Sequence, residues 1–243
     1  MSTHFDLCVV GGGILGAGIA QAAAINGLST IIVEKRGWGS GNSSKTGKLI
    51  GPGLEYMAPP SLLQARERLV EREILSSIAP DLVDGDWFYV PIYSHSQQKP
   101  WHVALQLTLR DCLSAGTNLP WHRRIPEDQW RDLTGLNQHN LRAVFALHDA
   151  QAEDAQLTQE VLRSAKQHGA MALCPVSFDG ARPTEDGYQV RVTKGSRSRA
   201  FDFRFLVNAA GAWGDQVKQT IGALEQLPRS ELIKSTYIEF REP

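Results

Sequence analysis

The sequence predicts an α/β fold with a parallel sheet, and three consecutive segments predict it. The apolar run Phe5–Val10 contains β-branched residues and ends in glycines, as buried parallel strands do. The Ala- and Ile-rich stretch Ile14–Asn26 follows and closes on Asn26-Gly27, a helix C-terminal signal. Ser29–Val33 is a second apolar strand. A strand, a helix and a strand in this order require a parallel crossover.

Later segments predict further elements and a second region. Residues 36–53 are rich in Gly, Ser and Lys and predict irregular structure, whereas residues 121–138 are polar and fit no element. The amphipathic helix Leu62–Ile78 is expected to carry Arg66, Glu67, Glu71 and Arg72 on its outer faces. The other expected elements are a strand at Trp87–Tyr93, helices at His102–Leu113 and Leu157–His168, a strand at Ala170–Ser177, a β-meander from Tyr188–Thr193 and Ala200–Val207, and a helix at Trp213–Ile221.

Composition excludes several classes of protein. The 243 residues carry 25 basic and 26 acidic side chains, so no charge excess indicates nucleic acid. The chain has no run of about 20 apolar residues and no basic N-terminal leader, so neither a membrane-spanning helix nor a signal peptide is expected. Three widely spaced cysteines predict no disulfide framework and no metal site. We expect a cytoplasmic protein.

A glycine motif joins the first strand to the first helix. It reads Gly11-Gly12-Gly13-Ile14-Leu15-Gly16. Gly11, Gly13 and Gly16 would provide a tight turn, a close approach of the backbone to a pyrophosphate, and close packing of the helix on the strand. The pyrophosphate would then contact the free amides of the helix start, at Ile14 and Leu15, and the positive end of the helix dipole. The motif predicts a dinucleotide site.

An acidic residue completes this motif. Glu34 ends the second strand at the spacing of about 20 residues that the motif requires, and its carboxylate can accept hydrogen bonds from the adenosine ribose. Lys35 follows it. Because a carboxylate disfavours a 2′-phosphate, NADP is not expected. FAD and NAD both stay open at this point. The following loop, with Ser43 and Ser44, could fold around a second polar group or could be a flexible surface loop.

The chain resembles the FAD-dependent glycerol-3-phosphate dehydrogenases, within the D-amino-acid-oxidase-like flavoprotein superfamily. The similarity is discontinuous and covers nearly the whole chain. The segments that resemble the family are Phe5–Lys35, Asn42–Tyr56 with its Lys-Leu-Ile, Arg66–Pro80, Asp154-Ala155 with Leu157, Leu206–Trp213 (Leu-Val-Asn-Ala-Ala-Gly-Ala-Trp), and Glu231–Lys234. The resemblance implies an FAD-binding Rossmann-like domain of the glutathione-reductase type, with a parallel sheet, a β-meander and an inserted, incomplete cap or substrate region.

The resemblance also implies domain bounds and site residues. Residues 1–57 and 157–222 would form a discontinuous FAD-binding domain, 58–156 a helical and mixed insertion, and 223–243 the start of a substrate domain. Ser43, Ser44, Lys48 and Leu49 would lie along the flavin, Val176 on the adenine side, and Ala209 to Gly211 behind the pyrophosphate. Tyr56 would lie near the substrate. Trp213, like Trp87 and Trp101, is expected in a core or a domain interface.

Three departures from the family pattern weaken the expectation of catalysis. Glu55 stands where the family has an arginine, which a phosphate-bearing substrate would favour. Tyr237 stands where the family has a histidine. The family's later basic residues and second flavin-binding glycine segment are not in this sequence, which resembles an N-terminal part only.

Three functions therefore stay open. The first is an FAD-dependent oxidoreductase that transfers a hydride from an alcohol or amine carbon of a small molecule to flavin N5. The second is a truncated or divergent FAD-binding fragment without activity, and the third is an NAD-dependent dehydrogenase. No catalytic residue is identified, because the histidines at 95, 102, 122, 139, 148 and 168 fall in polar stretches expected to be exposed. The resemblance leaves peripheral attachment to the inner face of the cell membrane, a quinone contact and a homodimer open.

Overall fold

The chain leaves its first unit after residue 47 and returns to it at residue 153. The computed structural model describes residues 4–50, 62–221, 231–234 and 236. Of these residues, the first unit contains 4–47, 153–221, 231–234 and 236, and the second contains 48–50 and 62–152. These crossings differ from the bounds at 57 and 157 that the sequence suggested. The region expected to begin a substrate domain, 223–243, lies almost wholly outside the described residues.

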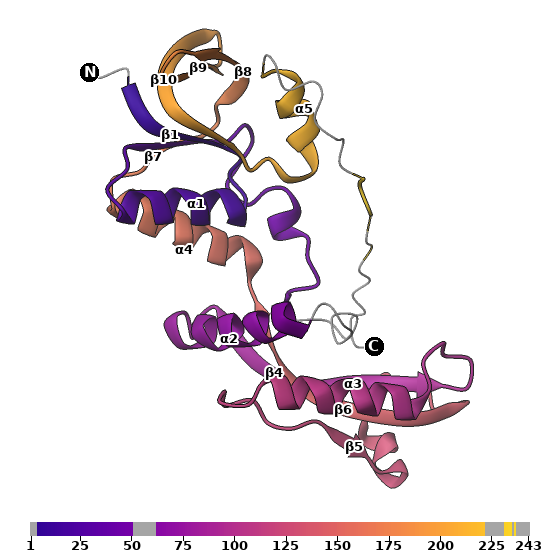
Figure 1. Cartoon of the computed structure of the whole chain (residues 1–243). Helices are drawn as coiled ribbons and strands as arrows, with labels where there is room; N and C mark the ends of the chain where they lie inside the picture. Colours follow the sequence, from indigo (N-terminus) through magenta and orange to yellow (C-terminus); the bar gives the residue numbers. More distant parts are fainter. Residues whose placement is uncertain (1–3, 51–61, 222–230, 235, 237–243) are drawn as a thin grey trace. The chain divides into compact units, whose positions relative to one another are not determined.

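The first unit is built on a six-stranded sheet of order β7-β2-β1-β10-β9-β8 (Figure 1). β1 pairs in parallel with β2 and β10, and β2 pairs in parallel with β7. β8, β9 and β10 form an antiparallel meander. The strands are β1 (His4–Val10), β2 (Thr30–Val33), β7 (Met171–Leu173), β8 (Ser177–Thr184), β9 (Gly187–Lys194) and β10 (Arg197–Asn208). The predicted parallel sheet with a meander is confirmed.

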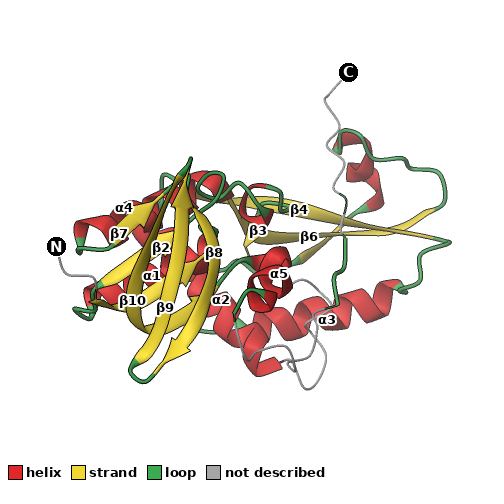
Figure 2. Cartoon of the chain, turned by 90° about the horizontal axis from the view of Figure 1, so that it is seen from above, coloured by secondary structure: helices red, strands yellow, loops and turns green. Residues whose placement is uncertain are grey.

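The two faces of this sheet have different covers. Leu7 and Val9 of β1 pack with helices α1 (Ile14–Ile25) and α4 (Asp154–Gln167). Cys8 and Val10 point to the other face and pack with side chains of the meander. This alternation follows from the period of two of a strand. Figure 2 shows the three meander strands side by side.

Several element bounds in the first unit correct the sequence-based expectation. α4 begins at Asp154 rather than Leu157, and Asn26 lies just beyond the end of α1. Residues 170–177 do not form one strand. β7 ends at Leu173, a cis peptide joins Cys174 to Pro175, and β8 begins at Ser177. Pro175 has no amide hydrogen and cannot continue the ladder. The last helix is a 3₁₀ turn, Gly211–Trp213, followed by α5 (Gly214–Gln219).

The second unit is built on a four-stranded antiparallel sheet. Its strands are β3 (Leu49–Ile50), β4 (Val83–Tyr93), β5 (Arg123–Ile125) and β6 (Leu141–Ala152). β6 is the central strand and pairs with the other three. α3 (Pro100–Leu113) buries Val103 and Leu107 against one face of the sheet, and α2 (Leu62–Ile78) packs against α3. Trp130, from the 3₁₀ segment Glu127–Asp132, contributes to a second cluster with Ile125 and Val144.

A buried ionic network joins α2, α3 and β6 in the second unit. Arg110 is fully buried and lies 3.5 Å from the carboxylate of Asp149, and it donates a hydrogen bond of 2.7 Å to the His148 carbonyl. Arg72 donates to the other oxygen of Asp149 at 2.9 Å. Arg72 is only 3% exposed, so the expectation that it lies on an outer face is wrong. The opposite charges of this network lie next to each other, although Nε and Nη1 of Arg110 have no hydrogen-bond partner among the described residues.

A histidine extends the network. Nδ1 of His122 lies 2.5 Å from Oδ2 of Asp111, and the His122 backbone amide donates to the same oxygen at 2.9 Å. The carboxylate of Asp111 is buried and also faces Arg110 at 3.6 Å. The expectation that His122 lies in an exposed stretch without a carboxylate partner is therefore wrong. These contacts indicate that His122 stabilises the second unit.

Replacing Arg110 by methionine is expected to lower the free energy of unfolding of the second unit by about 3–5 kcal/mol. Methionine fills much of the volume but leaves the buried Asp149 and Asp111 without their shared cation. Thermal and urea unfolding measure the change. Arg142→Met, which removes an exposed arginine from β6, is the matched control and should change stability by less than about 0.5 kcal/mol. Equal stabilities of the two variants would contradict the role of Arg110.

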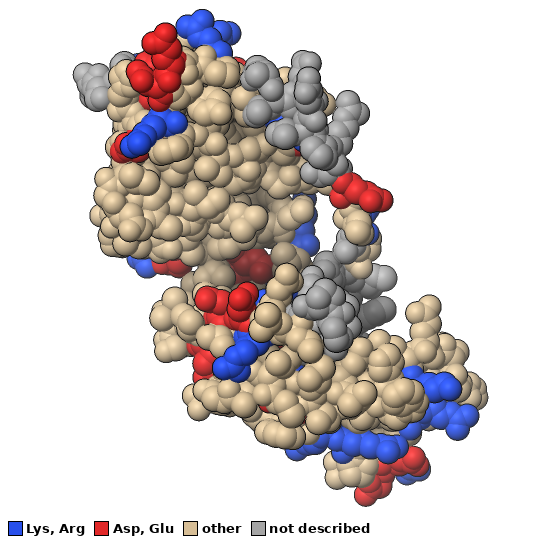
Figure 3. Space-filling view, viewed as in Figure 1, with Lys and Arg blue, Asp and Glu red and all other residues tan. Residues whose placement is uncertain are grey.

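The described residues also bear on the expectations for membrane helices, surface charge and cysteines. Among the described residues, no helix is long and apolar enough to cross a membrane. Both signs of charge occur on each unit, mainly along the margins of the face in Figure 3. Cys8, Cys112 and Cys174 are free thiols. Burial raises the pKa of the Cys8 thiol to about 12, because a thiolate would lose its hydration in the core.

Candidate functional site

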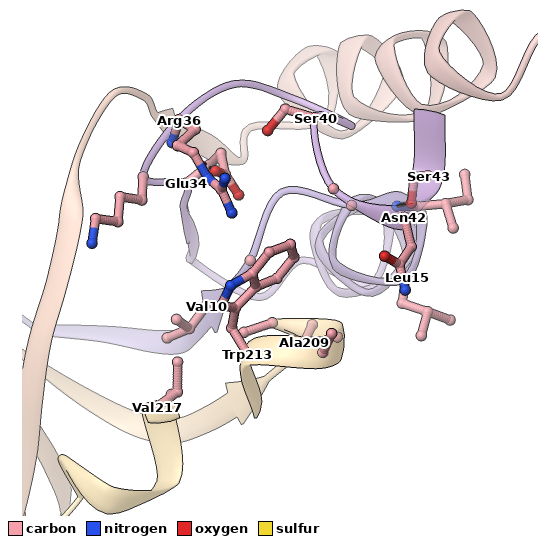
Figure 4. Close-up of a pocket in the computed structure, with 18 of the residues that line it drawn as sticks. Val10, Leu15, Glu34, Arg36, Ser40, Asn42, Ser43, Ala209, Trp213 and Val217 are labelled. Atoms are coloured by element: carbon pink, nitrogen blue, oxygen red, sulfur yellow. Dashed lines mark hydrogen bonds between the residues drawn. The ribbon is translucent and has the colours of Figure 1, made fainter. Parts of the chain in front are cut away.

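A cleft of about 820 Å³ opens at the carboxyl ends of β1, β2 and β10 in the first unit. This is where open parallel sheets bind ligands, and the volume is in the range of sites for small molecules and cofactors. Its walls are formed by residues 10, 11, 13–15, 33–36, 40–43, 46, 209–213, 216, 217 and 220, with Asp154, Leu157, Thr158, Val176 and Phe178. Figure 4 shows the side chains that converge on it.

The glycines of the motif allow close contacts that a side chain would block. Gly11 has a φ of +114°, and a Cβ there would lie 2.5 Å from the Ala209 carbonyl oxygen. A Cβ on Gly16 would lie 1.9 Å from the Gly11 carbonyl oxygen. Gly11 therefore provides the turn and the approach to β10, and Gly16 provides the packing of α1 on β1. Gly16 does not line the cleft, whereas Gly11 and Gly13 do.

The N-terminus of α1 presents donors to the cleft. The N-cap residue, Gly13, has no side chain that could cap the helix, and the Ile14 amide donates to Ser43 Oγ at 3.0 Å. For the amides of Gly13 and Leu15, the described residues provide no protein acceptor. A Cβ on Gly13 would lie 3.1 Å from Ser43 Oγ, inside this small space. Unpaired amides at the positive end of a 12-residue helix suit a pyrophosphate.

Glu34 is held in place by two backbone amides. Its Oε2 accepts a hydrogen bond from the Gly12 amide at 2.8 Å, and its Oε1 accepts one from the Arg36 amide at 2.7 Å. Its backbone bonds the Leu173 carbonyl at 2.9 Å and the Val176 amide at 2.8 Å. The carboxylate therefore has a fixed orientation at the cleft, with lone pairs left for ribose hydroxyls.

The remaining predicted site residues are divided between the units. Lys35, Ser43, Val176, Ala209 and Gly211 line the cleft, as do Ile14 and Leu15. Ser44 does not, and its hydroxyl donates to the Gly41 carbonyl at 3.2 Å. Lys48 and Leu49 belong to the second unit, so their place along the flavin stays a prediction. Tyr56 and Glu55 lie outside the described residues.

Arg36 and Trp213 are cleft residues that the sequence did not indicate. Trp213 was expected in a core or interface, but it is 38% exposed and lines the cleft. Arg36 lies in the segment expected to be irregular, and its guanidinium stands over the Trp213 ring. The position of Trp213, just after the turn Ala209 to Gly211, was the available signal. Val217 of α5 lines the cleft beside it (Figure 4).

Fold and cleft together define a dinucleotide-binding α/β protein. The family model described as FAD dependent oxidoreductase (DAO) matches residues 6–243. The D-erythritol 1-phosphate dehydrogenase of Brucella abortus is 34% identical over 96% of this chain and 46% of its own length. The glycerol-3-phosphate dehydrogenase of Synechocystis sp. is 33% identical over 89% of this chain and 40% of its own length. The chain thus spans less than half of these relatives.

Solved structures agree with this match. The glycerol-3-phosphate dehydrogenase of Bacillus halodurans, solved in complex with FAD, has a TM-score of 0.66 and 25% identity, covering 89% of this chain and 36% of that one. The L-proline dehydrogenase of P. horikoshii shares the fold, with a TM-score of 0.70 at 19% identity over 90% of this chain and 56% of its own. The chain belongs to the DAO family of FAD-dependent oxidoreductases. The predicted cofactor FAD is confirmed, and the NAD alternative is not favoured.

Proposed function

We propose that this protein provides the FAD-binding part of an oxidoreductase that oxidises an alcohol carbon of a phosphorylated polyol. The observation that carries the proposal is the Glu34 carboxylate, fixed by the Gly12 and Arg36 amides in the same cleft that the α1 N-terminus lines. Two relatives are named as dehydrogenases of glycerol 3-phosphate and of D-erythritol 1-phosphate, and these names support a phosphorylated polyol as the substrate.

The residues of the cleft would divide the work of binding. Glu34 would accept hydrogen bonds from the ribose, and the amides of Gly13 and Leu15 would bind the pyrophosphate. Val176 would contact the adenine side, and Ser43 would lie between the pyrophosphate and the flavin. FAD, when bound, supplies the hydride acceptor of the reaction. The chain's own contribution is to hold and orient that group.

The proposal is tested with purified protein and its flavin absorbance. We expect the protein to take up FAD, and glycerol 3-phosphate or D-erythritol 1-phosphate to bleach the bound flavin under anaerobic conditions. Unphosphorylated glycerol and erythritol are the controls and should not bleach it. Bound flavin that stays oxidised with every polyol phosphate would indicate an FAD-binding module without dehydrogenase activity, as Glu55 suggests. Protein that takes up no FAD contradicts the proposal as a whole.

The location and the partners of the protein belong to the same proposal. The family resemblance supports a cytoplasmic protein with a small-molecule substrate, and the balanced charge gives no support for a nucleic-acid partner. Peripheral contact with the inner face of the cell membrane, transfer of electrons to a quinone, and a homodimer are the arrangements that the resemblance adds. Sedimentation of the purified protein alone tests the dimer. Sedimentation together with lipid vesicles tests the membrane contact.

A further inference from the structure

Arg36 and Trp213 meet across the cleft of the first unit. Arg36 follows β2 and Trp213 follows β10, and these two strands flank β1 on opposite sides. Cζ of Arg36 lies 4.6 Å from the centroid of the Trp213 ring. The pair therefore spans the carboxyl end of β1, where Gly11 to Gly13 form the turn (Figure 4).

Trp213 is held from a second direction as well. A Cβ on Gly41 would lie 3.1 Å from Cζ3 of the indole, so the ring packs closely on the backbone of the loop. The indole thus contacts the segment that follows β2 at two points, Arg36 and Gly41. It remains 38% exposed, so no surrounding core prevents it from turning outward.

The charge of Arg36 faces the indole of Trp213. Within the described part of the chain, no carboxylate lies within ion-pair distance of its guanidinium. Its backbone amide holds Glu34, while its side chain extends over the indole. A planar guanidinium stacks on an aromatic face, a cation–π contact that the uncharged amide of Gln would not reproduce.

We propose that Arg36 and Trp213 form a latch over the pyrophosphate position, which must open when FAD enters or leaves and which closes again over the bound cofactor. The proposal rests on the proposed binding of FAD in this cleft. FAD would extend from Glu34 past the Gly11 to Gly13 turn toward Ser43, and the latch spans that turn. Arg36 is then a positioning residue that acts through Trp213.

The rates of FAD binding and release test the latch. In Arg36→Gln, association and dissociation should both become roughly two to five times faster, because the cation–π contact contributes about 0.5–1 kcal/mol. The affinity should hardly change, since the latch affects both rates. Trp213→Leu should act in the same way, and Arg36→Gln/Trp213→Leu should be no faster than the faster single variant. Stopped-flow measurement of flavin fluorescence gives the rates.

The alternatives give different results. If Arg36 binds the cofactor directly, Arg36→Gln slows association, speeds dissociation and weakens affinity, which overturns the latch. Unchanged rates overturn it too. Arg182→Gln, an exposed arginine of β8 outside the cleft, is the matched control and should leave both rates unchanged.

A readout without cofactor separates the latch from the proposed function. The contribution of Trp213 to fluorescence is the difference between proteins with Trp213 and with Trp213→Phe. In Arg36→Gln, acrylamide should quench this contribution more strongly than in the wild type. Unchanged quenching overturns the latch even where FAD binds, whereas increased quenching in a protein that takes up no FAD supports the Arg36–Trp213 contact and contradicts only the proposed function.

Discussion

Replacing Gly16 by alanine is expected to destabilise the first unit by about 3 kcal/mol, the upper end of the range for overpacking, and to abolish FAD binding. The new Cβ would lie 1.9 Å from the Gly11 carbonyl oxygen, which is backbone and cannot rotate away. α1 would have to move off β1, and its N-terminal amides would move with it. Thermal unfolding and flavin titration measure the two effects.

Gly18 offers a control within the same helix. A Cβ at Gly18 would meet nothing within 4 Å. Because alanine favours a helix interior over glycine, Gly18→Ala should stabilise the unit by roughly 0.5–1 kcal/mol and leave FAD binding unchanged. Similar stabilities for the two variants would show that α1 does not pack on β1 through Gly16.

Replacing Glu34 by glutamine is expected to weaken FAD binding by roughly 10- to 100-fold, equivalent to about 1.5–3 kcal/mol. The two carboxylate oxygens accept from the Gly12 and Arg36 amides. Glutamine has one oxygen and one NH₂ group, so it cannot accept at both ends. One amide loses its partner, and the ribose loses charged acceptors. Isothermal titration with FAD measures the change.

Glu185→Gln removes an exposed acid from the β8–β9 turn and is the control for the change in charge. It should bind FAD like the wild type. If Glu34→Gln also bound FAD with unchanged affinity, the ribose could not be at Glu34, and the orientation of the cofactor in the cleft would have to be revised.

Local patterns were enough to predict much of the first unit. The β1–α1–β2 segment is contiguous, its strands are buried on both faces, and its glycines serve contacts within a few residues of each other. The meander was predicted because its strands alternate and follow one another. The cis peptide before Pro175 and the break between β7 and β8 depend on tertiary context, which a continuous apolar pattern does not reveal.

The second unit was harder to predict for a physical reason. β6 pairs with β4 over most of its length, although the two strands are far apart in the sequence. β6 also contains alanines, His148 and Asp149, residue types with little preference for strands. This end of the strand depends on the contacts of Asp149 with the buried Arg72 and Arg110, which a local pattern does not reveal. The same holds for the cleft, since no local pattern joins Arg36 to Trp213.

The two crossings between the units lie next to each other on both sides. In the second unit, the Ala152 amide donates to the Lys48 carbonyl at 2.8 Å. In the first unit, the Thr46 hydroxyl donates to the Asp154 carboxylate. A segment whose ends are neighbours can be inserted, lengthened or exchanged by recombination without moving the ends of its host. Evolution can therefore vary residues 48–152 while the cleft of the first unit keeps its geometry.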